Sequence, residues 1–205
     1  MLRVEIAGNT YDLPTEYKEI TIAEYLDVYR VLMKYENIDE NDEIGHLQMY
    51  ADLFKLFTGV DDKTLAAIPF DDVTATINSL QGIMKEHEPE GISSFLCEGE
   101  RYHFPQMRLK GETFGAYIEA TQLDLQVNLL KHGKLDVIPE QMAILCRRTG
   151  EAFDDEYVQE RTEKFKHLTM DILWEYAFFL SRQTANLERA TQWCLASLQK
   201  KKMLV

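Results

Sequence analysis

The chain has 205 residues, 45% of them hydrophobic and 11% aromatic, which is enough apolar material for a buried core and excludes a disordered chain. Its 35 acidic and 22 basic residues give a formal net charge of -13, which disfavours nucleic acid and anionic membranes and favours solubility or a basic partner. Residues 1–90 hold 19 of the acidic and 7 of the basic residues, so nearly all the net charge lies in the first half.

The cysteine pattern indicates a reducing compartment. Cys97, Cys146 and Cys194 are odd in number and far apart, so they form neither a disulfide framework nor a CxxC pair. The N-terminus turns polar within ten residues, and no stretch approaches the length of a membrane-spanning helix. These features predict a cytosolic protein.

The first predicted element is a β-hairpin over residues 4–14. Apolar and polar residues alternate on both sides of Gly8-Asn9, a pair that tolerates the positive φ of a tight turn. Pro14 follows the second strand and predicts its end, because proline has no N–H for the strand ladder.

A helix is predicted to follow over residues 21–33. Thr21 is a good N-cap, and Glu24 three residues later completes a capping box. One helical face carries the apolar residues Ile22, Tyr25, Leu26, Tyr29 and either Leu32 or Met33.

A second apolar helix is predicted to begin at Met49 and to end at Thr58-Gly59, since glycine takes the left-handed cap without strain. The acidic pairs that follow are Asp61-Asp62 and Asp71-Asp72, the latter at the start of a helix over 69–84. Four carboxylates could in principle hold Mg²⁺ or act in acid/base chemistry. We favour helix caps, because acids at helix N-termini bind free amides and no histidine or nucleophilic lysine is near.

The second half repeats this order. A hairpin over residues 94–105 turns at Glu98-Gly99, and both hairpins end in Tyr, one residue, a large apolar residue and Pro. Thr113 is predicted to cap a helix whose apolar face includes Tyr117 and Leu123. Residues 140–150 are predicted to form another helix, which ends at Thr-Gly before a pair of acidic residues. A long helix closes each half.

The sequence therefore predicts an internal duplication. The fold class is α+β and mostly helical, with two tandem units that each contain a β-hairpin followed by about three helices. The first unit covers residues 1–90 and the second residues 91–205, with residues 85–93 as the junction.

No enzyme motif is present in the sequence. The five histidines share no metal-ligand spacing, and no phosphate-binding glycine loop or nucleophile elbow occurs. We therefore expect no catalytic residue, no metal and no cofactor. The aromatic segment 170–180, which includes Trp174 and Phe178, is apolar nearly all round and is predicted to be buried, in the core in preference to a partner interface.

Residues 53–80 resemble the small tail assembly chaperones of tailed bacteriophages. The resemblance rests on a helix, Thr-Gly, an acidic pair, two apolar residues before Pro and an Asp-anchored helix, namely Leu56, Thr58, Gly59, Asp61, Asp62, Leu65, Ile68, Pro69, Asp71, Asp72 and Val73. The second half also resembles proteins of tailed phages. The chain departs from the small members in having two units and added hairpins.

The resemblance implies a non-enzymatic protein that coats the helical tape-measure protein in the host cell cytoplasm while tail-tube subunits assemble. The alternative is a structural component of the virion, such as a ring, neck or packaged protein, which could form a homo-oligomer. In either case the partner is a protein. The contact surfaces that we expect are apolar helix faces, represented by Tyr25, Tyr29, Leu32, Tyr117, Leu123, Trp174 and Phe178.

Overall fold

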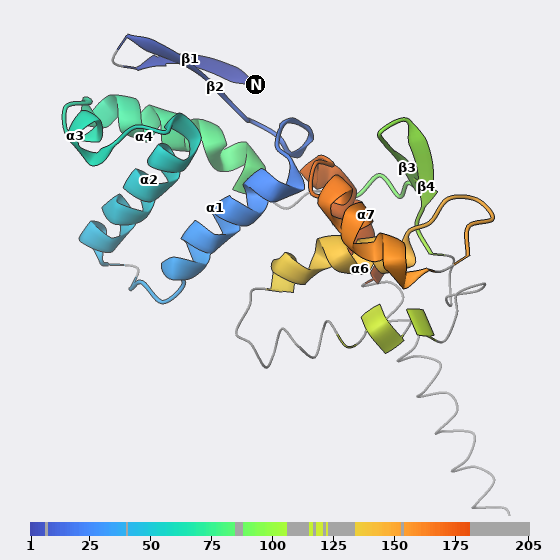
Figure 1. Cartoon of the computed structure of the whole chain (residues 1–205). Helices are drawn as coiled ribbons and strands as arrows, with labels where there is room; N and C mark the ends of the chain where they lie inside the picture. Colours follow the sequence, from blue (N-terminus) through green and yellow to red (C-terminus); the bar gives the residue numbers. More distant parts are fainter. Residues whose placement is uncertain are drawn as a thin grey trace, which may run out of the picture.

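The computed structural model in Figure 1 describes residues 1–6, 8–39, 41–84, 88–105, 115–116, 118–120, 122, 134–152 and 154–180. Its fold is α+β and mostly helical, with two small antiparallel β-hairpins and several helices, as the sequence predicts. No helix in this part of the chain is long and apolar enough to cross a membrane.

The first hairpin pairs β1 (Leu2–Ile6) with β2 (Asn9–Leu13). Val4 lies opposite Tyr11, and Ile6 lies opposite Asn9. Gly8, with a φ of 80°, lies in the loop, whereas Asn9 is already paired, so the turn begins one residue earlier than the Gly8-Asn9 pair predicts. Leu13 is fully buried where β2 ends before Pro14.

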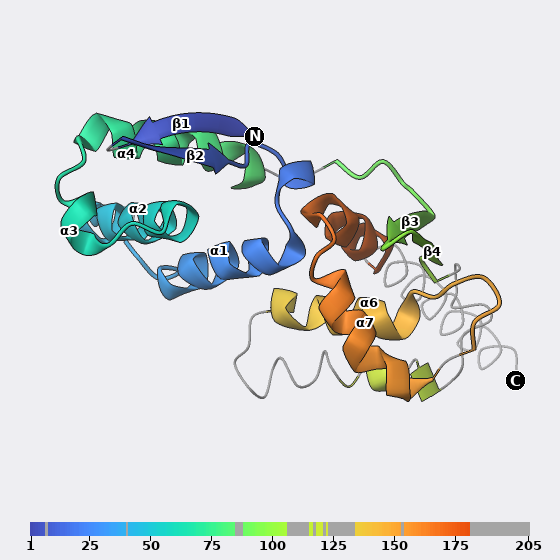
Figure 2. The ribbon, with the colours of Figure 1, turned by 45° about the horizontal axis from the view of Figure 1, so that its top comes forward.

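Four helices follow in the first unit: α1 (Ile22–Lys34), α2 (Glu43–Thr58), α3 (Asp62–Leu65) and α4 (Phe70–Ser79), which continues as a 3-10 turn over Leu80–Met84. Gly59 ends α2 in the left-handed conformation with a φ of 68°, which confirms the predicted helix stop. The first hairpin lies along α4 (Figures 1 and 2), and an added Cβ at Gly82 would come within 1.7 Å of the Thr15 carbonyl oxygen.

Asp52 of α2 binds side chains at the end of α1. Asp52 accepts hydrogen bonds from Lys34 Nζ at 2.6 Å and the Tyr35 hydroxyl at 2.8 Å, and Lys55 Nζ lies 3.2 Å away. These bonds, the one from Lys34 above all, lower the pKa of Asp52 to about 2. The charged Asp52 carboxylate is therefore the form that stabilises this pair of helices.

The N-terminus of α1 has a partner for each of its first amides. The Thr21 hydroxyl accepts the N–H of Glu24 and the Glu24 carboxylate accepts the N–H of Thr21, which confirms the capping box. The N–H groups of Ile22 and Ala23 donate to carbonyl oxygens of the second unit, Leu168 at 2.8 Å and Lys166 at 2.9 Å. A helix N-terminus leaves four free amides, and here two of them are satisfied from far along the chain.

The second hairpin pairs β3 (Ser94–Cys97) with β4 (Glu100–His103). Phe95 lies opposite Tyr102 and Cys97 opposite Glu100, with Glu98 and Gly99 at φ 51° and 83° in the turn, which confirms the predicted turn pair. Beyond β4, the Phe104 N–H donates to the Ser93 carbonyl oxygen.

The described helices of the second unit include α6 (Ile138–Leu145), α7 (Val158–Phe165) and residues 170–180. The expected helix stop at Gly150 is wrong, because α6 already ends at Leu145 and Arg147 forms a β-bridge with His103 of the hairpin. Gly150, with a φ of 77°, instead lies in a turn in which the Glu151 N–H donates to the Arg148 carbonyl oxygen.

Buried apolar residues from both halves form one hydrophobic core. The buried carboxylate of Glu175, in helix 170–180, accepts the N–H groups of Glu90 and Gly91, the latter at 3.0 Å. This contact ties the junction between the two halves to the last described helix. The predicted duplication into two units stays a prediction.

Candidate partner-binding surfaces

The apolar face of α1 is used within the fold. Tyr25 is only 8% exposed, and burial raises the pKa of its hydroxyl. Leu26 is buried, Leu32 is half-buried against the core, and Tyr29 is also half-buried. The expectation that Tyr25 contacts a partner is therefore wrong, because its side chain is part of the hydrophobic core.

The aromatic helix, residues 170–180, contributes mainly to the interior. Met170, Leu173 and Tyr176 are fully buried. Trp174 packs edge-on against Tyr17 of the first unit, with ring centroids 6.0 Å apart and an interplanar angle of 66°. Trp174 thus joins the two halves of this molecule while it is only half-buried, so its assignment to a partner surface stays a prediction. Phe178 is 39% exposed.

Three other predicted residues lie outside the described part of the chain. These are the partner-contact candidates Tyr117 and Leu123 and the predicted helix cap Thr113.

The four acids divide into one cap and three residues with other roles. Asp61 is the N-cap of α3, and its carboxylate accepts the Thr64 N–H at 2.7 Å; hydrogen bonds from Thr64 lower the pKa of Asp61. Asp62 lies in the first turn of α3 and forms a 3.0 Å ion pair with Lys55. Asp71 and Asp72 also lie in a first turn.

Neither Asp71 nor Asp72 is a cap. The N-cap of α4 is Pro69, without a side-chain hydrogen bond, so the prediction that these two residues cap a helix is wrong. Their carboxylates still face the positive end of the helix dipole.

Sequence reasoning missed an exposed apolar face on α2. Ile44 is 69% exposed and Leu47 is 45% exposed, and Ala51 is half-exposed on the same side. Leu53, on the opposite side of the helix, is fully buried, and so is Phe54, which follows Leu47 at spacing i+7 and continues its side into the core. The spacing i, i+3, i+7 would have revealed this face, but the predicted helix began at Met49 and excluded its first two members.

Further exposed apolar residues lie in the same unit. Phe70, at the start of α4, is 64% exposed, and Leu56, near the end of α2, is 39% exposed. The resemblance to phage chaperones includes Leu56 as a helix position, but the sequence carries no signal that distinguishes its exposed side from its buried side.

A charged cleft of about 350 Å³ lies between β3–β4 and α7 in the second unit. Its lining contains three acids, three basic residues and two tyrosines, namely Glu98, Glu100, Tyr102, Arg148, Tyr157, Glu160, Arg161 and Lys164. Lys164 Nζ lies 2.8 Å from Glu160 and 3.3 Å from Glu98, and the hydrogen bonds to these residues raise the pKa of Lys164. Arg148 lies 2.8 Å from Glu100.

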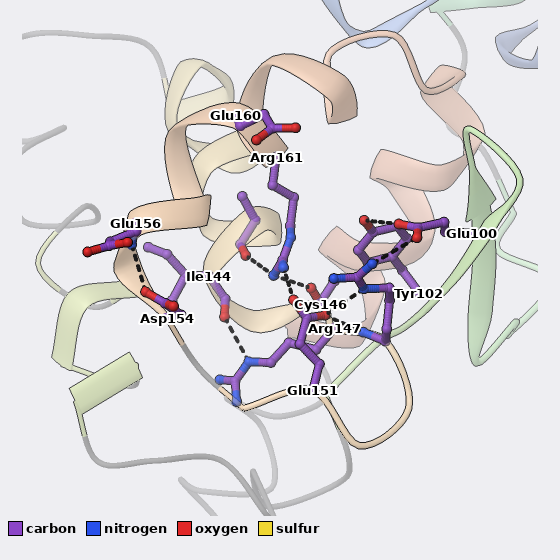
Figure 3. Close-up of polar contacts among 12 residues, drawn as sticks. Glu100, Tyr102, Ile144, Cys146, Arg147, Glu151, Asp154, Glu156, Glu160 and Arg161 are labelled. Carbon is purple, nitrogen blue, oxygen red and sulfur yellow. Dashed lines mark hydrogen bonds and ion pairs between the residues drawn. The ribbon is translucent and has the colours of Figure 1, made fainter.

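Arg161 has a structural role beneath this cleft (Figure 3). Its buried guanidinium donates to the carbonyl oxygens of Ala143 at 3.1 Å and Cys146 at 3.4 Å, and it forms an ion pair with Glu151. The last carbonyls of a helix lack partners within the helix, so Arg161 satisfies the C-terminal end of α6. The charged groups of the cleft thus bind one another and join hairpin, turn and helices.

Metal-ligand side chains do not cluster in the described residues. None of their His, Cys, Asp and Glu side chains gather in a group of three or more that could hold a metal ion. Cys97 and Cys146 are buried thiols. Burial raises the pKa of Cys97, which lowers the fraction of the reactive thiolate form.

Comparisons with known protein families, with curated proteins and with solved structures found no match to this chain.

Proposed function

We propose that this chain is a non-enzymatic assembly protein of a tailed bacteriophage, a tail assembly chaperone that binds the helical tape-measure protein in the host cell. The proposal begins from the sequence resemblance over residues 53–80. Binding would keep the long apolar-faced helices of the client soluble until tail-tube subunits surround them.

The local structure of the resembling segment supports this proposal. Helix α2 stops at Gly59, Asp61 caps the short helix α3, and Pro69 opens α4, in the order that the motif predicts. The segment therefore holds two helices, α2 and α4, side by side through a compact acidic connection (Figure 1).

The observation that carries the proposal is the set of exposed apolar side chains on these same helices. Ile44 and Leu47 of α2 and Phe70 of α4 are each at least 45% exposed. Apolar residues at helical spacing are the anchors with which amphipathic helices pack on one another. An acidic surface around them keeps a coated client soluble through its net charge.

Co-expression tests the proposal. The tape-measure protein of the same phage, or a helical fragment of it, is produced alone and together with this chain, and the soluble fraction is passed over a size-exclusion column. We expect the client to be insoluble alone and to co-elute with this chain when both are present. A client that never co-elutes would contradict the proposal.

Mass spectrometry of purified virions separates the chaperone from a structural virion component. A chaperone is absent from the finished particle, whereas a ring or neck protein is present in a fixed number of copies. Detection of this chain at a fixed ratio to the tube protein would replace the chaperone assignment by the structural one.

A further inference from the structure

The exposed face of α2 is an apolar stripe made of Ile44, Leu47 and Ala51, which we call the α2 stripe. Helix α2 packs against α1 and α4 (Figure 1). Leu53, on the side opposite the α2 stripe, is fully buried. Phe54 follows Leu47 at spacing i+7 and is also fully buried, so the exposed part of the stripe ends before Phe54. Positions i, i+3 and i+7 lie on one side of a helix, so the three side chains form a continuous line along it. Ile44 and Leu47 keep much of their surface in water, where burial against a partner would be favourable.

Acidic residues lie at the N-terminal end of the α2 stripe. Glu36, Asp39, Asp42 and Glu43 are all exposed and occupy the connection from α1 and the first turn of α2. The carboxylates of Asp39 and Asp42 accept N–H groups from Asn41 and Gly45, and the hydrogen bonds from Asn41 lower the pKa of Asp39.

A second acidic cluster lies at the other end. Asp61 and Asp62 follow the end of α2 directly, and the 3.0 Å contact between Asp62 and Lys55 places this cluster at the last turns of the helix. Asp71 and Asp72 begin α4 next to it, and all four are exposed. Helix α2, which carries the α2 stripe, therefore has an acidic cluster at each of its two ends, with Lys55 paired to Asp62 at the second.

We infer that the α2 stripe binds an amphipathic helix whose apolar face has lysine or arginine residues at both ends. The apolar line would bury the hydrophobic face of that helix, and the two acidic clusters would pair with its basic ends. The inference rests on the proposed function for the identity of the client and adds the chemistry that selects the bound segment.

The charge of the stripe's surroundings disfavours other occupants. A second copy of the same surface would bring acidic clusters into contact with acidic clusters, which costs energy. Nucleic acid and anionic lipid are repelled for the same reason.

Two synthetic peptides test the charge requirement. Both have leucines at helical spacing on one face, and they differ only in having lysines or glutamates at the two ends; binding to the full chain is measured by fluorescence anisotropy. We expect the lysine peptide to bind at least about ten-fold more tightly, and its affinity to fall when salt is raised from about 0.05 to 0.5 M. Equal affinity for both peptides would overturn the inference.

Substitutions on the protein test the site. The double variant Ile44→Gln and Leu47→Gln keeps good helix formers on a solvent-exposed face, so it should fold, and we expect it to bind the lysine peptide about ten-fold or more weakly. The matched control is Leu96→Gln in β3, where the leucine is 58% exposed but lies in the second unit. Circular dichroism checks that both variants remain folded.

The charge contribution has its own pair of variants. Glu36→Gln with Glu43→Gln should weaken lysine-peptide binding and reduce its salt dependence, whereas Glu140→Gln with Glu156→Gln, two exposed acids of the second unit, should leave both unchanged. An equal loss from the two pairs would mean that only the overall charge matters, and the proposed site would be wrong.

The natural client separates failure of this inference from failure of the proposed function. If the tape-measure protein co-elutes equally with the wild type and with the Ile44→Gln, Leu47→Gln variant, the client binds elsewhere and only the α2 stripe inference is wrong. If it co-elutes with neither, the proposed function is wrong, whatever the peptides do.

Discussion

The two β-hairpins share one register but are held in place by different contacts. In each hairpin, the residue two positions before the end of the first strand lies opposite the tyrosine of the Tyr-x-apolar-Pro motif. These pairs are Val4 with Tyr11 and Phe95 with Tyr102. Each turn also has a glycine at positive φ three residues before that tyrosine. The first hairpin packs along α4, where a glycine lets backbone meet backbone at Gly82 and Thr15. The second packs through aromatic rings.

The aromatic contacts of the second hairpin centre on Phe165 of α7. Its ring lies edge-on to Phe95 and Tyr102, with centroids 5.3 Å and 5.0 Å apart, and Phe104 continues the cluster to Tyr176 at 6.2 Å. The comparison shows that two hairpins with the same strand register can pack on the rest of the protein in different ways. The turn residues set the register, whereas the side chains on the buried face set the contacts.

Phe165→Ala should have the largest effect on this difference. Removing a fully buried ring that contacts two others should lower the free energy of unfolding by about 3–5 kcal/mol. Chemical denaturation measures the change. Phe57→Ala, which removes a half-buried phenylalanine of the first unit, is the matched control and should cost clearly less. Equal losses in the free energy of unfolding would show that the aromatic cluster stabilises the protein no more than the half-buried Phe57 does.

Gly82→Ala should disrupt the first hairpin. An added Cβ would lie 1.7 Å from the Thr15 carbonyl oxygen, and a backbone atom cannot move aside as a flexible side chain can, so we expect a loss of roughly 3 kcal/mol. The control is Gly8→Ala in the hairpin turn, where a Cβ meets nothing within 4 Å and only the positive φ is penalised, at about 1 kcal/mol. The prediction fails if Gly8→Ala is the more destabilising change.

Asp52→Asn tests the ion-pair contact of the first unit. The carboxylate has a pKa lowered to about 2, so its stabilisation is complete above about pH 4, the ordinary range of an aspartate, and is lost as the pH falls toward 2. Its side chain is 23% exposed, and solvent screening limits the effect to roughly 1 kcal/mol near pH 7. The stability difference between the two proteins should shrink between about pH 4 and 2, and a constant difference would contradict the assignment.

The smallest expected effects distinguish a cap from a dipole contact. Asp61→Ala removes the hydrogen bond to the Thr64 N–H and should cost about 1 kcal/mol, whereas Asp61→Asn should cost much less, because asparagine caps nearly as well. Asp71→Ala removes only a charge near the start of α4 and should cost about 0.3–0.5 kcal/mol. Thermal unfolding of the three variants measures the ranking, and an Asp71→Ala loss equal to that of Asp61→Ala would restore the capping role.

Local signals in the sequence were sufficient where the chain determines its own conformation. The capping box at Thr21, the helix stop at Gly59 and the Glu98-Gly99 turn each depend on residues within four positions of one another. Such contacts form whatever the rest of the molecule does, so the fold class and the two hairpins could be predicted.

Long-range contacts account for the errors. Nothing near Leu145 explains why α6 stops there, since the reason is the bridge between Arg147 and the hairpin residue His103. Tyr25 and Trp174 have the apolar pattern of either a core or an interface, and their location was decided by residues distant in the sequence, such as Tyr17 for Trp174. The same holds for the α2 stripe, which is exposed because α1 and α4 cover only the other side of the helix.

The bridge between Thr21 and Thr169 has a consequence for the order in which the protein can be completed during synthesis. The amides of Ile22 and Ala23 bind carbonyls of residues 168 and 166, which leave the ribosome long after α1 itself. Until then the start of α1 must rely on its capping box and on water. The first unit therefore reaches its full set of backbone contacts only after most of the second has been made, so a chain cut at the junction should have a helix α1 that frays from its N-terminus.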